Sequence, residues 1–529
     1  MRSLAAPGAL LAALAAPPPA VADGAVQTAA DAELERAAER RFRSAEQFYG
    51  GGRYDQALRD FEAVLEVMPE SRLADDAALR IARHRFDVEG DHAAAGAMAE
   101  RVLRQFPAGD AAPGAHLLLG ELAAAGSPPR PDDALAEFER VLSAVGPSGS
   151  PWSFSALTGI AALLDARGDP AGAAGALLAA LHEAPNEAPR AEGRILPLRL
   201  ELARALARAG EFDAALAEIG GLRAETLEVA RRGDGAGAFE AGAEALRLAE
   251  SASALANLIF RFRGPGPPVW SFAGALRAPR PLRDPRRLRM GGGQLFVLDV
   301  DEEEVQVFRP DGGSGEFAGA YGVRDPRDLA LAPAGEGGIP TPVVAAENTL
   351  FVGGNTLSLT VSGAGSRQEP LRRVRAVAAV PEGYWVWDDR EKTVHRFSSR
   401  GDHLGRTAHP RLDDVIRISR HPAGHLVLID EDQGVLGFDA EGRRVFHIPR
   451  DQGLEEPVDL AFDALGHLYI LDAEGPTVAV HGRDFSSLTL LRGDILPGSA
   501  VREPVSLAVG EDGTIFILAR APRSVAVFR

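Results

Sequence analysis

Cysteine does not occur among the 529 residues, which excludes disulfide bonds, thiolate metal sites, cysteine nucleophiles and a lipid-modified N-terminal cysteine. Lysine is almost as scarce, since Lys392 is the only one and arginine supplies the other basic side chains. Aromatic residues make up 6% of the chain, which disfavours a protein that reads polysaccharide or peptidoglycan by stacking. Stability must come from buried cores alone.

Charge and hydropathy exclude further classes of partner. The net charge of -18 at pH 7 would repel nucleic acid and anionic membranes, so neither is expected as a partner. No apolar run reaches the roughly 20 residues that a membrane span requires. Hydrophobic residues are 46% and charged residues 25% of the chain, as in soluble globular proteins, and the length predicts two or more cores.

The first 22 residues have the pattern of a secretory signal peptide. Arg2 supplies a positive start, residues 4–16 a short apolar core, and residues 20–22 a small-residue cleavage site. We predict a signal peptide at 1–22 and export to the periplasm or the exterior of a cell with a bacterial-type envelope. The alternative is a disordered tail rich in alanine and proline.

A repeat runs through residues 32–260. A turn glycine is followed five residues later by alanine, and then by a bulky residue, leucine and proline at four-residue steps, as in Gly52, Ala57, Phe61, Leu65 and Pro69. The aligned alanines recur in five copies, at positions 57, 95, 134, 173 and 215. Glycine permits a tight turn, alanine lets two helix backbones approach, and proline ends the second helix. The pattern predicts five helix–turn–helix units.

These units resemble the tetratricopeptide repeat family over about 200 residues. The resemblance implies an all-α superhelix whose concave groove holds a protein or peptide partner. Carrying the family's groove positions onto the first two units gives a set of partner-binding residues: Phe42, Glu46, Tyr49, Arg80, His84 and Asp87. The alternative interpretation is that these are ordinary packing or solvated positions.

Beyond a Pro/Gly break at 264–268, within a predicted linker at 261–268, short apolar runs alternate with turns. One phrase recurs as Asp284-Pro285-Arg286-Arg287-Leu288, and its last position returns at 329, 377, 418, 460 and 507. Six units of this period predict a six-bladed all-β propeller at 269–529. Because residues 272–275 repeat residues 317–320, a fourth-strand sequence, we expect residues 269–272 to complete blade six.

The blades resemble the NHL family through a strand ending in Asp, a Val-x-Val-Phe strand and an Asp-Gly turn. Asp299, Asp388, Asp430 and Asp472 occupy the same place in their blades, so we interpret them as turn caps and not as metal ligands. His421 and His425 are separated by a predicted hairpin turn and form no convincing metal pair. No nucleotide loop or serine elbow is present, and we predict no cofactor, metal or catalytic residue.

These patterns predict an exported protein–protein interaction scaffold and not an enzyme. Its helical groove would hold one partner segment, and the propeller face a second ligand. Because the 264–268 break separates the helical repeats from the blades, we expect few contacts between their cores. The alternative is a metal-dependent lyase or lactonase whose chemistry lies in the propeller channel, because some propellers that resemble the NHL family are such enzymes.

Overall fold

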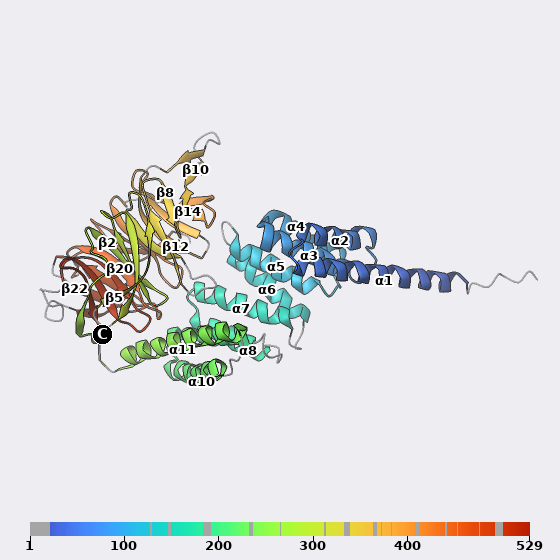
Figure 1. The fold of residues 1–529 in the computed structure, drawn as a ribbon, viewed down its shortest axis with the longest axis horizontal. Coiled ribbons are helices and arrows are strands. Elements are labelled where there is room, and N and C mark those ends of the chain that lie inside the picture. Colours follow the sequence, from blue (N-terminus) through green and yellow to red (C-terminus); the bar gives the residue numbers. More distant parts are fainter. Residues whose placement is uncertain are drawn as a thin grey trace, which may run out of the picture. The chain divides into compact units, whose positions relative to one another are not determined.

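The computed structural model describes residues 22–126, 130–145, 150–183, 192–231, 236–264, 266–311, 314–332, 339–362, 368–371, 373–381, 383–407, 412–439, 442–451, 453–474, 477–491 and 501–529, and the statements below concern this part of the chain. The predicted signal peptide lies outside it except for Ala22. The chain divides into two compact units, 1–122 and 123–529, each described by itself. Helices precede strands (Figure 1), and no described helix is long and apolar enough to cross a membrane.

The first unit is built from helices that meet at alanines. Ala57 and Ala95 are fully buried, and the turn glycines Gly52 and Gly90 adopt φ angles of 71° and 64°, where a side chain would be strained. This arrangement is the one that the repeat predicts. The elements are α1 (Ala22–Gly50), α2 (Tyr54–Val67), α3 (Ala74–His84), the π-turn η1 (Arg85–Glu89), α4 (His92–Gln105) and α5 (Ala112–Ala125), whose end belongs to the second unit.

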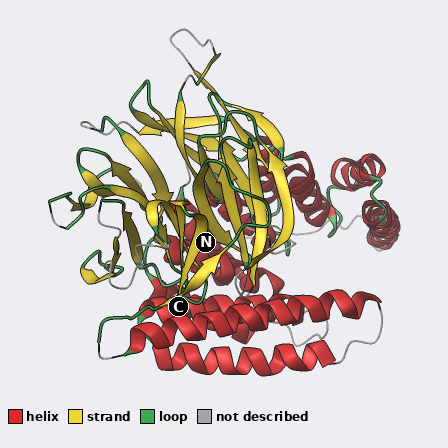
Figure 2. Ribbon diagram, turned by 60° about the vertical axis from the view of Figure 1, so that its left-hand side comes forward, coloured by secondary structure: helices red, strands yellow, loops and turns green. Residues whose placement is uncertain are grey.

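The second unit continues the same helical design. Ala134, Ala173 and Ala215 are at most 1% exposed, and Gly168 and Gly210 again have positive φ. Helices α10 and α11 are long neighbours that lie side by side (Figure 2). The helices are α6 (Pro131–Val145), α7 (Pro151–Ala166), α8 (Pro170–Glu183), α9 (Glu192–Ala209), α10 (Phe212–Arg231) and α11 (Ala236–Arg263).

The strands form the predicted six-bladed propeller. Each blade is a four-stranded antiparallel sheet, and the first strands of neighbouring blades contact one another in a closed ring around the axis. Alternating side chains of facing sheets fill the space between blades, so each blade shares an apolar cluster with the next.

The strands of each blade can be followed along the chain (Figure 1). Blades one to three are β2 (Pro285–Gly291), β3 (Gln294–Asp299), β4 (Glu304–Asp311), β5 (Ser314–Gly322); β6 (Asp328–Ala332), β7 (Thr341–Ala345), β8 (Thr349–Val352), β9 (Asn355–Ser358); and β12 (Val374–Val380), β13 (Gly383–Asp388), β14 (Thr393–Ser398), β15 (His403–Thr407). Blades four to six are β16 (Val415–Arg420), β17 (Leu426–Asp430), β18 (Gly434–Phe438), β19 (Arg444–Ile448); β20 (Pro457–Phe462), β21 (Leu468–Asp472), β22 (Thr477–His481), β23 (Ser487–Leu491); and β24 (Arg502–Val509), β25 (Ile515–Ala521), β26 (Arg523–Phe528), β1 (Phe272–Leu276). A hairpin of β10 (Thr360–Ser362) and β11 (Gln368–Pro370) separates blades two and three.

Blade six is closed by the segment that follows the helices, as the sequence predicts. Strand β1 pairs with β26, with Ala275 opposite Ala526, and Ser271 exchanges backbone hydrogen bonds with Arg529. The closing strand covers residues 272–276 and so begins where the predicted strand ends. Residues 269–271 instead lead into it, with Trp270 buried in the apolar cluster shared by blades five and six.

The helices of the second unit contact the turns between the first and second strands of blades four, five and six. Phe262 of α11 stacks on His467 with ring centroids 3.8 Å apart, and Leu465 belongs to the apolar cluster of α9–α11. The Trp270 indole donates to the Gly513 carbonyl at 2.7 Å. These contacts overturn the expectation that few contacts join the helical and propeller cores across residues 264–268.

Candidate functional site

The structure brings four of the six predicted groove residues together. Glu46 of α1 pairs with Arg80 of α3 at 2.9 Å, and the ring centroids of Tyr49 and His84 are 5.7 Å apart. His84 is 3% exposed, whereas Tyr49 is half-buried beside the more open Tyr54. These four residues link α1 to α3 across the start of the first unit.

The remaining two predicted groove residues differ in character. Phe42 packs edge-on against Phe61 of α2 with ring centroids 5.3 Å apart, which is a packing role. Asp87 is exposed on η1. Burial, followed by the nearby Asp87 carboxylate, raises the pKa of Tyr49, which places Asp87 close to the Tyr49–His84 pair.

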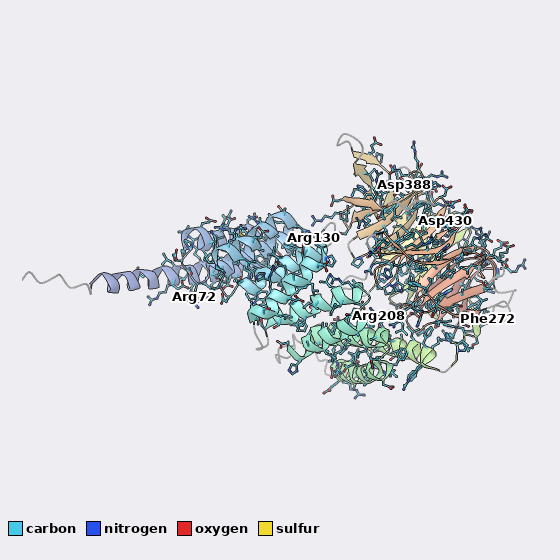
Figure 3. All side chains as sticks on the ribbon, turned by 180° about the vertical axis from the view of Figure 1, so that it is seen from behind. Arg72, Arg130, Arg208, Phe272, Asp388 and Asp430 are labelled. Carbon is cyan, nitrogen blue, oxygen red and sulfur yellow. The ribbon has the colours of Figure 1, made fainter. Side chains whose placement is uncertain are left out.

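The aspartates at the ends of the second strands are turn caps, as predicted. Asp299 accepts backbone N–H groups from Arg283 and Asp284 at 2.6 and 3.0 Å. Asp430 and Asp472 likewise accept the N–H groups of Asp413 and Glu455 at 3.2 and 2.6 Å. Asp388 instead accepts the Arg390 N–H at 2.8 Å, from the turn that follows it, and Asp388 and Asp430 are marked in Figure 3. All four carboxylates therefore cap turns, and three of them also hold the segment that leads into their blade.

His421 is likewise used by the backbone. Its Nδ1 accepts the Ala423 N–H at 3.0 Å, and its Nε2 lies 3.2 Å from the Gly466 carbonyl. Burial lowers its pKa to about 4. The neighbouring His425 stacks against it at 5.7 Å, so the pair serves the turn that contacts α7.

The propeller axis is lined by a ring of six residues, one from each first strand. Each precedes the buried apolar residue of the repeated phrase, and we call the set the axial ring. Around the axis it contains a basic, an acidic and a small residue, and then the same order again: Arg287, Asp328, Ala376, Arg417, Asp459 and Ser506.

The charges of the axial ring are joined across the axis. Asp328 accepts from Arg287 at 2.8 Å and from Arg417 at 3.3 Å. Asp459 accepts from Arg417 at 2.8 Å and from Arg289 at 3.1 Å. Both carboxylates are fully buried, and Arg417 is 1% exposed.

The small members of the ring make these bonds possible. Because Ala376 has no long side chain, Arg417 of blade four reaches past blade three to Asp328, which also accepts the Val377 N–H at 3.0 Å. The short Ser506, whose hydroxyl donates to Asp459, likewise lets Arg289 of blade one reach past blade six to Asp459 at 3.1 Å. Burial raises the pKa of Asp328, with Arg287 acting against that rise. The axis is thus a filled ionic core.

A second set of side chains stands just outside the ring, at one end of the axis. In five blades the first strand carries a bulge directly before the ring residue, which inserts one extra residue at this end. In blade two, Arg327 precedes Asp328 in the same place. We call the set the axial mouth: Arg286, Arg327 and Arg375 on blades one to three, and Ile416, Val458 and Val505 on blades four to six.

Two adjoining cavities open at the axial mouth, and both are lined by Arg327 and Arg375. One, of about 330 Å³, is also lined by Arg286, Arg287, Val300, Pro326 and Ile416. The other, of about 450 Å³, adds Arg373 and Lys392 together with the carboxylates of Asp389 and Asp414. Cations therefore outnumber acids in a chain whose net charge is -18.

The cations of the mouth are not equally engaged. Arg375 pairs with Asp414 and, at 3.1 Å, with Glu431, and Arg286 bonds to Asp284 at 2.8 Å. Among the described residues Arg327 has no recorded hydrogen bond or ion pair for its side chain, which is exposed. It is the cation best placed to meet a ligand.

A further acidic group lies in the first unit. Asp75, Asp76 and Asp110 bring their carboxylates within 4.8 Å of one another. Two backbone N–H groups, those of Asp76 and Ala111, bond to Asp75 at 3.0 and 3.3 Å. Burial, with Asp110 and Asp75 adding to it, raises the pKa of Asp76 to about 6.

The sequence-based predictions missed the axial ring and the axial mouth. The signal was present in the repeated phrase itself, whose third and fourth positions change from blade to blade while the flanking proline and leucine recur in four of the blades. The chemistry of these third and fourth positions becomes visible only when the six first strands are placed around one axis.

No known family model matches the chain, and no curated protein matches its sequence. Among solved structures, a streptogramin B lyase is similar at 10% identity with a TM-score of 0.36, covering 49% of this chain and 97% of its own. A virginiamycin B lyase from Staphylococcus aureus is similar at 11% identity and a TM-score of 0.33, covering 46% of this chain and 80% of its own. A catalytically inactive variant of that lyase, with quinupristin, gives 10% and 0.33, with coverages of 47% and 82%. Similarity at this level of identity and TM-score says nothing about the activity of this chain.

Proposed function

We propose that this chain is an exported binding scaffold, in which tetratricopeptide-like helices hold a protein segment and the propeller holds a second ligand at its axial mouth. The observation that carries the proposal is the filled axis. Asp328 and Asp459 are fully buried and bonded to arginines, so the carboxylates that a channel enzyme would need are already engaged.

The helical part of the proposal is supported by the first unit. Tyr49 and Asp87 are accessible next to the buried His84, on elements that are held by the Glu46–Arg80 pair. Aromatic and charged side chains on a rigid frame are suitable anchors for a partner segment, because little conformational entropy is lost when they bind.

Capture of partners from envelope extracts by the full chain tests this part. We expect Tyr49→Ala and Asp87→Ala to weaken capture by about 2 kcal/mol for a true anchor, with the helical signal unchanged. Glu62→Ala, which alters an exposed carboxylate on α2, is the matched control. Phe42→Ala should lower the melting temperature instead, because Phe42 packs on Phe61.

The competing proposal, a metal-dependent lyase or lactonase, makes a different prediction. Elemental analysis of the purified full chain would then find a divalent ion in a one-to-one ratio, and a chelator would abolish a turnover. Such an ion, together with capture that is indifferent to Tyr49 and Asp87, would lead us to abandon the scaffold.

A further inference from the structure

We propose that the axial mouth binds a small molecule that carries a carboxylate on an aliphatic body. The inference rests on the proposed binding role of the propeller and specifies the class of its ligand. It follows from the lining of the mouth, where arginines from blades one to three lie beside the apolar side chains of Val300, Pro326 and Ile416.

The basic part of the lining selects the charge of the ligand. Arg327 lines both cavities and has no recorded side-chain partner among the described residues, while its neighbour Arg375 is oriented by Asp414 and Glu431. A guanidinium group offers two parallel N–H donors that match the two oxygens of a carboxylate. The surrounding excess of cations lowers the cost of bringing an anion to an acidic protein.

The apolar part of the lining selects the body of the ligand. Val300, Pro326 and Ile416 line the same cavity as Arg286 and Arg327. A carboxylate held by Arg327 would therefore have apolar side chains within reach of its alkyl carbons, which gain free energy when they leave water.

The axial ring sets the depth of the site. Asp328 and Asp459 are completely buried under their arginines, so they form a closed floor and offer no free oxygen to a cationic ligand. A cavity of about 330 Å³ above this floor has the size for a single head group with a short body.

Titration calorimetry of the full chain with octanoate, acetate, inorganic phosphate and octylamine tests the proposal. We expect saturable binding of octanoate, weaker binding of acetate and phosphate, and none of octylamine. Each methylene that becomes buried should strengthen binding about fourfold along a series from butyrate to octanoate.

Substitutions at the mouth refine the test. Arg327→Gln should weaken octanoate about tenfold, and Arg327→Lys should recover part of that loss. Arg324→Gln removes a charge three residues away, outside both cavities, and should have no effect. Ile416→Thr should weaken octanoate without changing acetate.

Three results would overturn the inference: equal binding of octylamine, equal binding of acetate and octanoate, or binding that is indifferent to Arg327 in a correctly folded variant. Partner capture that still depends on Tyr49 and Asp87 would leave the scaffold standing in that case. Stoichiometric metal and turnover would instead remove the scaffold, whatever octanoate does.

Discussion

At the scale of single residues, the axial ring fills the centre of the propeller with paired charges where an apolar core would otherwise be expected. Charged groups are stable in a protein interior only when partners replace the lost water. Arg417 bonds to two carboxylates from different blades, and each carboxylate also accepts a backbone N–H. The bond from Arg417 to Asp328 therefore ties blade four to blade two, which is not its neighbour in the ring, while the bond to Asp459 ties it to blade five.

Removing one charge from the ring should destabilise the propeller strongly. Asp459→Asn leaves Arg289 and part of Arg417 without a counter-charge, and we expect a loss of about 3–5 kcal/mol in the free energy of unfolding. Chemical denaturation followed by tryptophan fluorescence measures it. Glu302→Gln breaks an exposed pair with Arg283 in blade one and should cost less than about 1 kcal/mol. Equal losses would show that the buried network has no special weight.

At the scale of elements, one turn of blade four is fitted closely to a helix. Gly424 has φ of 84°, and a Cβ there would lie 2.9 Å from the backbone carbonyl oxygen of Ala166 at the end of α7. The equivalent turn of blade one contains Gly293, with φ of 70° and open space around it. Substitutions at both glycines would strain the backbone, but only a substitution at Gly424 would also disturb the contact with α7.

Alanine at the two positions should have unequal effects. Gly293→Ala carries only the left-handed strain of about 1 kcal/mol. Gly424→Ala adds overpacking against α7, a further loss of about 1–3 kcal/mol. Thermal unfolding gives the difference, and protease cleavage near α7 should rise only in the Gly424 variant. If both variants lose the same amount, the contact with α7 contributes nothing to stability.

How much of this could be predicted differs between elements. Helix pairs and blades could be predicted from local spacing. Ala57 and its equivalents recur where two helices cross, and Leu288 and its equivalents recur where a first strand is buried. The docking of α11 did not, since nothing near Phe262 in the sequence indicates that His467 will meet it. The mouth depends on bulges, which a repeat of polar and apolar residues does not reveal.

At the scale of the whole molecule, the two units should respond to acid in opposite ways. The pKa of Asp76, raised to about 6, makes a contribution to stability that is present below its ordinary value near 3.8 and is lost as pH rises through about 6. In blade three, burial lowers the pKa of His395 to about 4. That contribution is present above about 6.5 and is lost as pH falls toward 4.

Hydrogen exchange resolved by segment tests this prediction on the full chain. Between pH 7 and pH 4.5, corrected for intrinsic rates, protection of α2–α4 should rise while protection of β13 and β14 falls. Asp76→Asn should flatten the first trend, and His395→Gln the second. Glu70→Gln, an exposed site, should change neither. Trends of the same sign in both units would contradict the assignment.

The pairing of β1 with β26 has a consequence in time. Residues 277–522 separate the two strands, so at 5–20 residues per second β1 is made about 10–50 s before its partner. During that interval the backbone groups of Phe272–Leu276 have no partner strand, because the other three strands of blade six are the last to be made. The ring can close only after residues 523–528 have been made, so β1 remains an unpaired edge until the end of synthesis.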